Sequence, residues 1–542
     1  MHPAIKKEAF NLNSYKVFYI KKQEDLKELD KLKGKTIAIT AFTDGLVPGV
    51  LNVLSLCVAS DDCVFFLPFT TKNKDTSVNM YAMIDSLKSL QDNQVVVQNL
   101  QFMVSCFGRL NLTFKNLIDV SKLHRDRGEH VKGNLASLAL YHLGVEIKDL
   151  DTEEITRLKT LEDDTIIKYS TDRAIVVYQI YQRIKQPYSL KSELETLLAV
   201  PLNNFCVKNI NFDAETRRRW METATGSDLK LLKQLGHPEN SKDPCNVVMG
   251  SLLNIKLGTL HTSFLRLNSI VTKLITKDEK YADLIKARPG KRLLCLSTQL
   301  LQLMAYCYNL PDDSEVDYLY SADNAIGEYL ENIVDDEVLT KIKNHNMARE
   351  VLKTILLIDS PYQLHRSLSV LLDYEVPLKA ATNILMRHHK SAHHDITNPV
   401  RQALRDDGYY EYLGSKYRTL ENLSYSRKDS EKLRTEINRE VKLASRWRYC
   451  VSISVLWLSW LCNVLKTNES GNNLNLVWFN SLWTVFEIQD CHDRNLEAIK
   501  GDRYIREIFS HHQMPMNIGF DYYFASDLKD AMKQQEQHYE KL

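Results

Sequence analysis

Short apolar runs separated by polar turns fill the first 180 residues of the chain. Three runs rich in β-branched and aromatic residues lie between Asp, Gly and Pro residues, which predicts consecutive strands. These runs are Thr36–Thr40, Val53–Ala59 and Cys63–Phe69. Helical spacing follows at Met80–Leu90 and Asn134–Leu143, with a strand pattern between them in the segment VVVQNL. The alternation predicts an α/β domain.

From about Tyr178 onward, the apolar positions recur with helical spacing over long stretches. No repeat, low-complexity tract or Gly/Ser-rich linker separates this part from the first, so we expect the two parts to pack rigidly. The predicted helices are Leu300–Tyr308, Ala322–Ile333, Asp336–Ile358 and Arg427–Leu465, and the predicted strands lie near Leu260–Phe264, Arg292–Leu296 and Leu476–Ile488.

Composition narrows the function classes. At 542 residues the chain is long enough for two or more domains. Lys and Arg number 70 against 69 Asp and Glu, so no global basic field attracts nucleic acid, and any such surface must be local. Ten scattered cysteines without a CxxC pair, and a start without an apolar leader, predict reduced thiols inside the cell. The nucleus is favoured over the mitochondrion or cytoplasm.

Tyr449–Leu465 is apolar and carries no charge. It is shorter than the roughly 20 residues of a spanning helix and contains three serines and an asparagine. We therefore expect a buried core helix and no contact with a membrane.

Four positions in the first part lie in recognisable segments. Thr40 and Phe42 occur in ITAFTDGL, Met103 ends QNLQFM, and Arg173 follows Tyr169 by four residues. These segments resemble the three motifs of the 3′–5′ exonuclease domain of family A DNA polymerases, in which the four positions carry metal-binding carboxylates. A thioether, a phenyl ring and a guanidinium do not hold Mg²⁺, which prefers hard oxygen ligands. The resemblance implies a ribonuclease-H-like domain that lacks exonuclease activity.

The second part is similar to the polymerase domain of the same family. GTLHTSF (258–264) resembles the strand that opens the palm, and Cys295 stands where the family's motif A has its metal-binding aspartate. Leu482 and Trp483 in SLWTVFEI replace the acidic pair of motif C. Nucleotide transfer needs carboxylates that hold two metal ions. The resemblance therefore implies an inactive palm, with neither metal nor cofactor; a rival alignment of motif C uses His492 and Asp493.

Several basic residues match positions of the family that touch nucleic acid or the incoming triphosphate. Arg349 and Lys353 are four apart on the predicted fingers helix, where an exposed helix with ordinary surface charges is the alternative. Further basic residues accompany Tyr409, Tyr410, Tyr412 and Tyr417, although interspersed glutamates equally suit a solvated helix. The candidate nucleic-acid contacts are Lys273, Arg349, Lys353, Arg418, Arg434 and Arg446.

Two other groups have alternatives that remain open. The histidines of RHHKSAHHD place His389 and His393 four apart, which suits zinc, but no third ligand is identifiable and an exposed polar helix end is favoured. Arg217, Arg218 and Arg219 precede Trp220 and form a second local basic segment.

Together these features predict three regions: an inactive exonuclease-like domain (1–180), a reduced thumb-like helical region (181–257) and an inactive palm and fingers (258–542). The predicted function is a pseudoenzyme that binds DNA or RNA as an adaptor or scaffold in a larger protein complex. The alternatives are a scaffold that binds proteins only, and a residual metal-dependent nuclease or polymerase that uses other residues such as Asp172 and Asp493.

Overall fold

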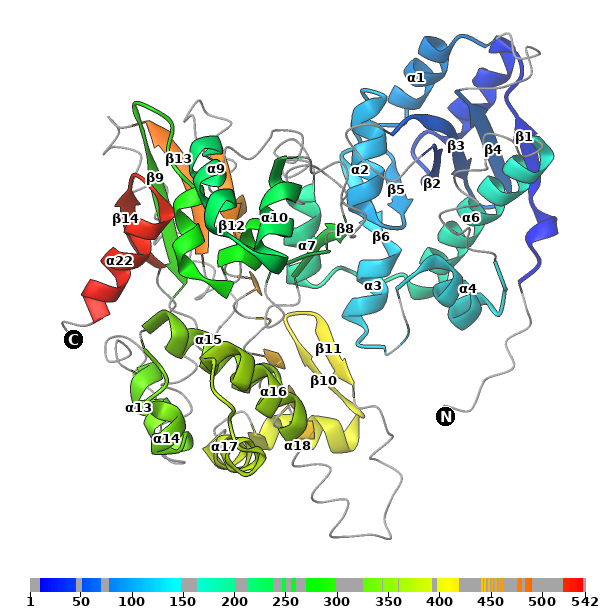
Figure 1. The fold of residues 1–542 in the computed structure, drawn as a ribbon. Coiled ribbons are helices and arrows are strands. Elements are labelled where there is room, and N and C mark those ends of the chain that lie inside the picture. Colours follow the sequence, from blue (N-terminus) through cyan, green and yellow to red (C-terminus); the bar gives the residue numbers. More distant parts are fainter. Residues whose placement is uncertain are drawn as a thin grey trace.

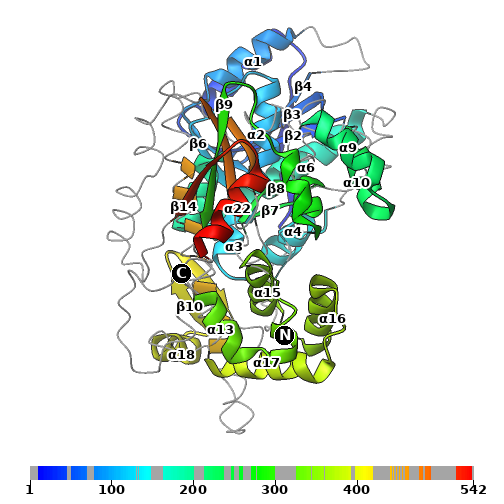
Figure 2. The same cartoon turned by 60° about the vertical axis from the view of Figure 1, so that its left-hand side comes forward.

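The computed structural model contains two larger sheets, each covered by helices, and a group of helices that lies below both in the view of Figure 1. Figure 2 shows the same arrangement after a 60° turn. The residues described are 10–44, 51–69, 78–129, 131, 133–147, 163–199, 213–236, 246–249, 255–259, 270–275, 277–298, 325–343, 345–358, 360–391, 397–418, single positions between 440 and 462, 475–479, 483–489 and 520–539.

The first sheet has six strands in the order β1-β4-β3-β2-β5-β6. The three predicted runs form an antiparallel meander of β2, β3 and β4, while β5 and β6 continue parallel to β2 and β1 pairs parallel with β4. The strands are β1 (Lys16–Tyr19), β2 (Thr36–Thr43), β3 (Val53–Ala59), β4 (Cys63–Pro68), β5 (Gln94–Val97) and β6 (Asn116–Asp119).

Helices cover both faces of this sheet because its strands are apolar on both sides. Successive side chains of a strand point to opposite faces. Ile37 and Ile39 enter one core, shared with η2 (Gln23–Leu32), α1 (Met80–Lys88) and α2 (Leu100–Arg109). Ala38, between them, enters the other core, shared with α3 (Val120–Asp126), α4 (Leu135–Leu143) and α6 (Asp163–Ile184).

A short helical region follows, with α7 (Leu190–Leu197), α9 (Ala214–Thr223) and α10 (Gly226–Gly236). Helix α7 is tied to α3 by a buried ion pair. The Arg125 guanidinium donates to Glu195 at 2.6 Å, and Lys122 lies 3.5 Å from the same carboxylate. These two cations hold the pKa of Glu195 below its usual value against the opposing effect of burial. Helix α7 therefore docks on the first domain.

The second sheet is antiparallel, with the order β12-β13-β9-β14. Its strands are β9 (Lys291–Thr298), β12 (Asn475–Phe479), β13 (Trp483–Gln489) and β14 (Phe520–Ala525), and it is accompanied by η5 (Glu279–Leu284) and α22 (Leu528–Tyr539). A small hairpin pairs β7 (Asn246–Met249) with β8 (Ile255–Thr259). The predicted strands around Arg292 and Leu476–Ile488 are confirmed, the latter as two strands. The strand predicted at Leu260–Phe264 lies outside the described residues.

The helices α13 to α18 form the group below the two sheets in Figure 1. The prediction of one helix over Asp336–Ile358 is wrong. Helix α14 ends at Leu339, where the chain tightens into a turn with bonds from Lys341 N to Val338 O and from Ile342 N to Leu339 O. The elements are α13 (Ala325–Ile333), α14 (Asp336–Leu339), α15 (His345–Leu357), α16 (Pro361–Leu372), α17 (Leu378–Ser391), α18 (Thr397–Asp406), β10 (Tyr409–Tyr412) and β11 (Ser415–Arg418).

The described positions between 440 and 462 are helical. Val451, Val455, Leu458 and Leu461 are at most 4% exposed and belong to the largest apolar core, as expected for a buried helix. Among the described residues, no helix has the length and apolar character to cross a membrane. The helix predicted at Leu300–Tyr308 lies outside the described residues.

Candidate functional site

Three of the four exonuclease-motif positions come together between β2 and α6. Thr40 and Phe42 alternate along β2 with Ile39 and so point toward α6. The Thr40 hydroxyl donates to the carbonyl of Ser170 at 3.5 Å, and the Phe42 ring meets Tyr169 edge to face, with centroids 6.0 Å apart. Arg173 lies one helical turn beyond Tyr169, its guanidinium 5.0 Å from the ring centroid.

This first centre therefore has an aromatic and cationic character. A guanidinium that stacks on an aromatic face repels a metal ion and attracts an anion such as phosphate. The fourth position, Met103, is 3% exposed and packs in the apolar core shared by η2, α1 and α2. The structure thus places Met103 among hydrocarbon side chains.

Two aspartates near the first centre have other surroundings. Asp172 is half-buried; burial raises its pKa, and Lys168 opposes this shift. Asp44 accepts hydrogen bonds from the backbone and side chain of Asn52 at 2.7 and 2.8 Å, and so closes the loop after β2. Asp493, the other residue proposed for a residual activity, lies outside the described residues.

The second centre is the middle of the four-stranded sheet. Cys295 on β9 is fully buried, with Val485 of β13 on one side and Tyr523 of β14 on the other. Burial raises the pKa of its thiol, so the thiol stays uncharged. Trp483 is 2% exposed and pairs with Ser297, and its ring meets that of Tyr523. Leu482 lies outside the described residues.

Helix α22 covers the side of β9 on which Cys295 lies. Ser297, two residues further, points to the same side, and the side-chain amide of Gln535 donates to its hydroxyl at 2.7 Å. Gln535 in turn accepts from the Arg349 guanidinium at 2.9 Å. A buried polar chain therefore joins α15, α22 and β9 two residues from Cys295.

Arg349 is 1% exposed, so in this structure its guanidinium serves this internal chain. Lys353, one turn further along α15, pairs with Glu350 at 2.6 Å. Lys273 is exposed on a helical segment. The prediction that these three bind phosphate stays a prediction, as it does for Arg434 and Arg446, which lie outside the described residues.

The tyrosines of the predicted basic and aromatic series lie with Lys416 and Arg418 in the β10–β11 hairpin. Tyr409 pairs with Arg418, and the cations of Lys416 and Arg418 lie 4.4 and 4.9 Å from the Tyr409 ring centroid. Arg418 also donates to the carbonyl of Arg127, at the end of α3, at 2.8 Å. We name the face formed by Tyr409, Lys416 and Arg418 the hairpin face. In both views the hairpin lies between the lower helices and the first domain.

The other predicted groups have structural partners. Arg219 and Trp220 both donate to Asp283 at 2.8 Å. The expectation of an exposed helix end is wrong for His388, which is 4% exposed and lies 2.5 Å from the Tyr329 hydroxyl. The reason is that His388 lies on a buried face of α17 that is two turns long. The apolar spacing of this face is visible in the sequence. The side chains of His389 and His393 lie outside the described part of the chain.

Sequence reasoning missed the polar partners that arise from distant parts of the chain. Glu487 on β13 is 2% exposed and accepts from the backbone and side chain of Arg288, with further charge contact from Lys291 at 3.4 Å. Burial raises the pKa of Glu487, but the hydrogen bonds from Arg288 outweigh it and hold the pKa below its usual value. Glu487 and Arg288 are 199 positions apart, and no local signal in the sequence marks them as partners.

Comparison with known proteins identifies a similar fold. No family model matches the sequence, and no curated protein matches it. The chain is similar to a solved structure described as the POL domain of Pol1 from M. smegmatis in complex with DNA primer-template and dNTP. The similarity covers 95% of this chain and 100% of that one, at 12% sequence identity and a TM-score of 0.53. The chain therefore has a mixed α/β fold similar to that of a DNA polymerase domain.

Proposed function

We propose that this protein is a polymerase-derived pseudoenzyme that binds nucleic acid as an adaptor and performs no metal-dependent catalysis. The observation that carries the proposal is the burial of Cys295. Its thiol stands at the position of a metal-binding aspartate, is fully buried, and lies on the side of β9 that α22 covers. A buried neutral thiol at that place supplies no hard oxygen ligand for Mg²⁺.

We also infer that residues 1–180 derive from a ribonuclease-H-like exonuclease. The antiparallel meander β4-β3-β2, followed by β5 and β6 parallel to β2, is the strand order such a domain requires. Residues 181–257 then represent a reduced thumb, and residues 258–542 the palm and fingers. Arg173 at the first centre supports the same loss of metal binding, since its cation repels a divalent ion.

The hairpin face is the surface we assign to nucleic acid. Its aromatic ring and two cations combine base stacking with charge, which is the chemistry of single-strand recognition. The near-balance of total charge favours a small local contact over a long electrostatic track.

The test is fluorescence-anisotropy binding of the purified protein to labelled single-stranded DNA, single-stranded RNA and duplex, in EDTA and over a salt series. We expect metal-independent binding that weakens with salt. Lys416→Gln removes one hairpin cation, and Lys533→Gln, exposed on α22, is the matched control. Loss of one phosphate contact reduces the slope of log K against log salt by about 0.7–0.9.

The outcomes separate the proposal from its alternatives. If the protein binds none of the three nucleic acids at low salt, the adaptor hypothesis is refuted and the protein-only scaffold is favoured. The pairing of Lys416 with Glu411 at 3.4 Å, within the hairpin, is the observation that favours the protein-only scaffold. Incorporation of nucleotides or digestion of DNA in Mg²⁺, abolished by a substitution at Asp172 or Asp493, would establish a residual enzyme instead.

A further inference from the structure

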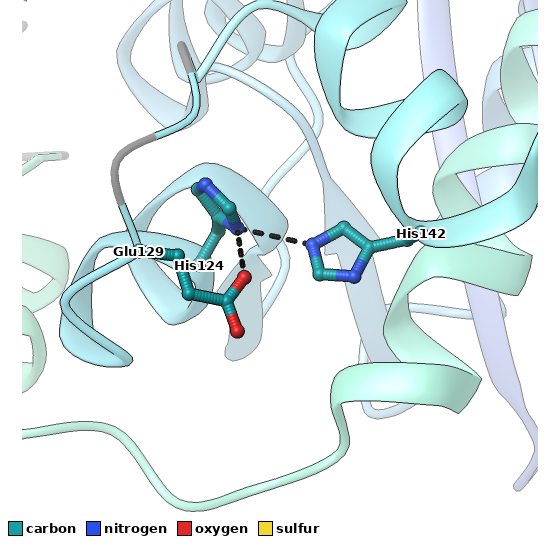
Figure 3. A group of neighbouring side chains, drawn as sticks. All are labelled: His124, Glu129 and His142. Atoms are coloured by element: carbon teal, nitrogen blue, oxygen red, sulfur yellow. Dashed lines mark hydrogen bonds and ion pairs between the residues drawn. The ribbon is translucent and has the colours of Figure 1, made fainter. Parts of the chain in front are cut away.

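Three potential metal ligands converge in the first domain, away from the two centres described above. His124 lies near the end of α3, Glu129 in the segment that follows, and His142 near the end of α4. Figure 3 shows their side chains pointing toward one another. His124 and His142 are 2% and 4% exposed, so the group is shielded from solvent.

The distances within this group suit a small cation. Nδ1 of His124 lies 3.0 Å from Nε2 of His142 and 3.3 Å from Oε2 of Glu129, and the three ligand atoms all lie within 4.8 Å of one another. Two ligands at 2.0–2.1 Å from a tetrahedral Zn²⁺ are about 3.4 Å apart. Modest side-chain adjustments therefore bring the atoms to coordination distance.

The protonation of His124 is set by its second ring nitrogen. Nε2 lies 3.2 Å from the carbonyl oxygen of Val131, which only accepts hydrogen bonds, so Nε2 carries a hydrogen. In the neutral ring, Nδ1 then presents a lone pair toward His142 and Glu129. A backbone carbonyl that fixes the tautomer in this way is the usual partner of a metal-bound histidine.

The carboxylate of Glu129 is also oriented by a hydrogen bond to one of its two ligand atoms. Arg127 donates to its Oε1 at 2.8 Å, while Oε2 is buried and makes no hydrogen bond of ordinary geometry. Burial raises the pKa of Glu129, but the neighbouring His124 and Arg127 side chains outweigh this and lower it to about 2. One carboxylate oxygen is held by Arg127, and the other lies toward the two imidazoles.

We propose that His124, Glu129 and His142 form a Zn²⁺-binding site with a fourth position for water. Two imidazole nitrogens and one carboxylate oxygen form a donor set that zinc accepts. The site joins the ends of α3 and α4 through the segment that carries Arg127, whose carbonyl receives Arg418 of the hairpin face. Zinc at this place braces the loop on which the hairpin docks. The site stands independently of the proposed nucleic-acid function.

The experiment is titration of the full chain, stripped with EDTA and dialysed, with zinc chloride alone, read by elemental analysis and by melting temperature. We expect one equivalent of bound zinc and a higher melting temperature. Glu129→Gln keeps an acceptor for Arg127 but removes the anionic ligand, and it should weaken zinc binding on the order of 100-fold. Glu146→Gln, an exposed change in the same domain, should bind as the wild type does.

X-ray absorption of the zinc-loaded wild type gives a readout that does not depend on any variant folding. Two imidazoles and oxygen ligands at about 2.0–2.1 Å are expected. Failure of the wild type to retain zinc would overturn the site. Equal zinc affinity of Glu129→Gln and the wild type, or a spectrum with a different number of imidazoles, would overturn it as well.

Discussion

The side-chain amide of Gln535 hydrogen-bonds the hydroxyl of Ser297 at 2.7 Å, across 238 positions of sequence. This contact brings the C-terminal helix α22 onto β9, two residues from Cys295. Because Gln535 also accepts from the buried Arg349, a single amide connects the lower helices to the second sheet. Strand β9 is therefore part of a closed, internally bonded core.

Replacing Gln535 by leucine should destabilise the protein by about 1–3 kcal/mol, since buried polar partners lose their hydrogen bonds. Urea unfolding followed by circular dichroism measures the change. Gln537→Leu, exposed on the same helix, should stay within about 0.5 kcal/mol of the wild type. Equal stability of the two variants would contradict the role assigned to Gln535.

Cys295→Asp places a carboxylate at a buried position of β9 and should confer no polymerase activity, because a single buried carboxylate does not hold two metal ions. The variant should lose roughly 2–4 kcal/mol of stability, whereas Cys295→Ala should lose less. Burial raises the pKa of the new carboxyl, so its penalty grows as the pH rises above about 4. Unfolding at low and neutral pH, with a primer-extension assay in Mg²⁺, tests both statements, and extension by Cys295→Asp would contradict the first.

The contact between Glu487 and Arg288 makes the free energy of unfolding depend on pH in the acidic range. The pKa of Glu487 is lowered in the folded state, so its contribution is present above the unfolded value of about 4.3 and is lost as the pH falls through the folded value. Glu487→Gln should cost about 1–3 kcal/mol at neutral pH and show a smaller further loss in acid. Glu331→Gln, exposed on α13, is the control and should keep the wild-type pH profile. Parallel pH profiles for Glu487→Gln and the wild type would count against this pairing.

Gly128 allows the backbone of the β10–β11 hairpin to approach the first domain closely. Its φ is +66°, and a Cβ there would lie 2.2 Å from the carbonyl oxygen of Lys416. Gly34 has a similar φ of +76° but open space around the missing Cβ. Gly34→Ala should therefore cost only the backbone strain, about 1–2 kcal/mol, whereas Gly128→Ala should cost more.

Hydrogen exchange provides the second readout for this pair. Amides of β10 and β11 should lose protection in Gly128→Ala and keep it in Gly34→Ala. Similar protection of the hairpin in both variants would show that the close approach of Gly128 to Lys416 is not needed for docking.

The local pattern of the sequence was sufficient to predict the strands β2, β3 and β4 and the helices α1 and α4. Each of these has a clear apolar period and punctuating Asp, Gly or Pro residues. The same reasoning missed the end of α14 at Leu339, because the apolar spacing continues across a turn made by backbone bonds. It also predicted an exposed place for His388, whose burial depends on Tyr329 of another helix.

The sequence alone determined which side chains stand in the segments that resemble the catalytic motifs of the polymerase family. Thr40, Phe42, Arg173 and Cys295 are read directly, and their chemistry decides what they can bind. Only the tertiary structure decided their partners. Arg173 stacks on Tyr169, and Cys295 lies on the side of β9 that is covered by α22, a helix that begins at Leu528. The convergence of His124, Glu129 and His142 also depends on how two helix ends meet. Side-chain identity is local, whereas burial and hydrogen-bond partners follow from packing between segments that the sequence keeps far apart.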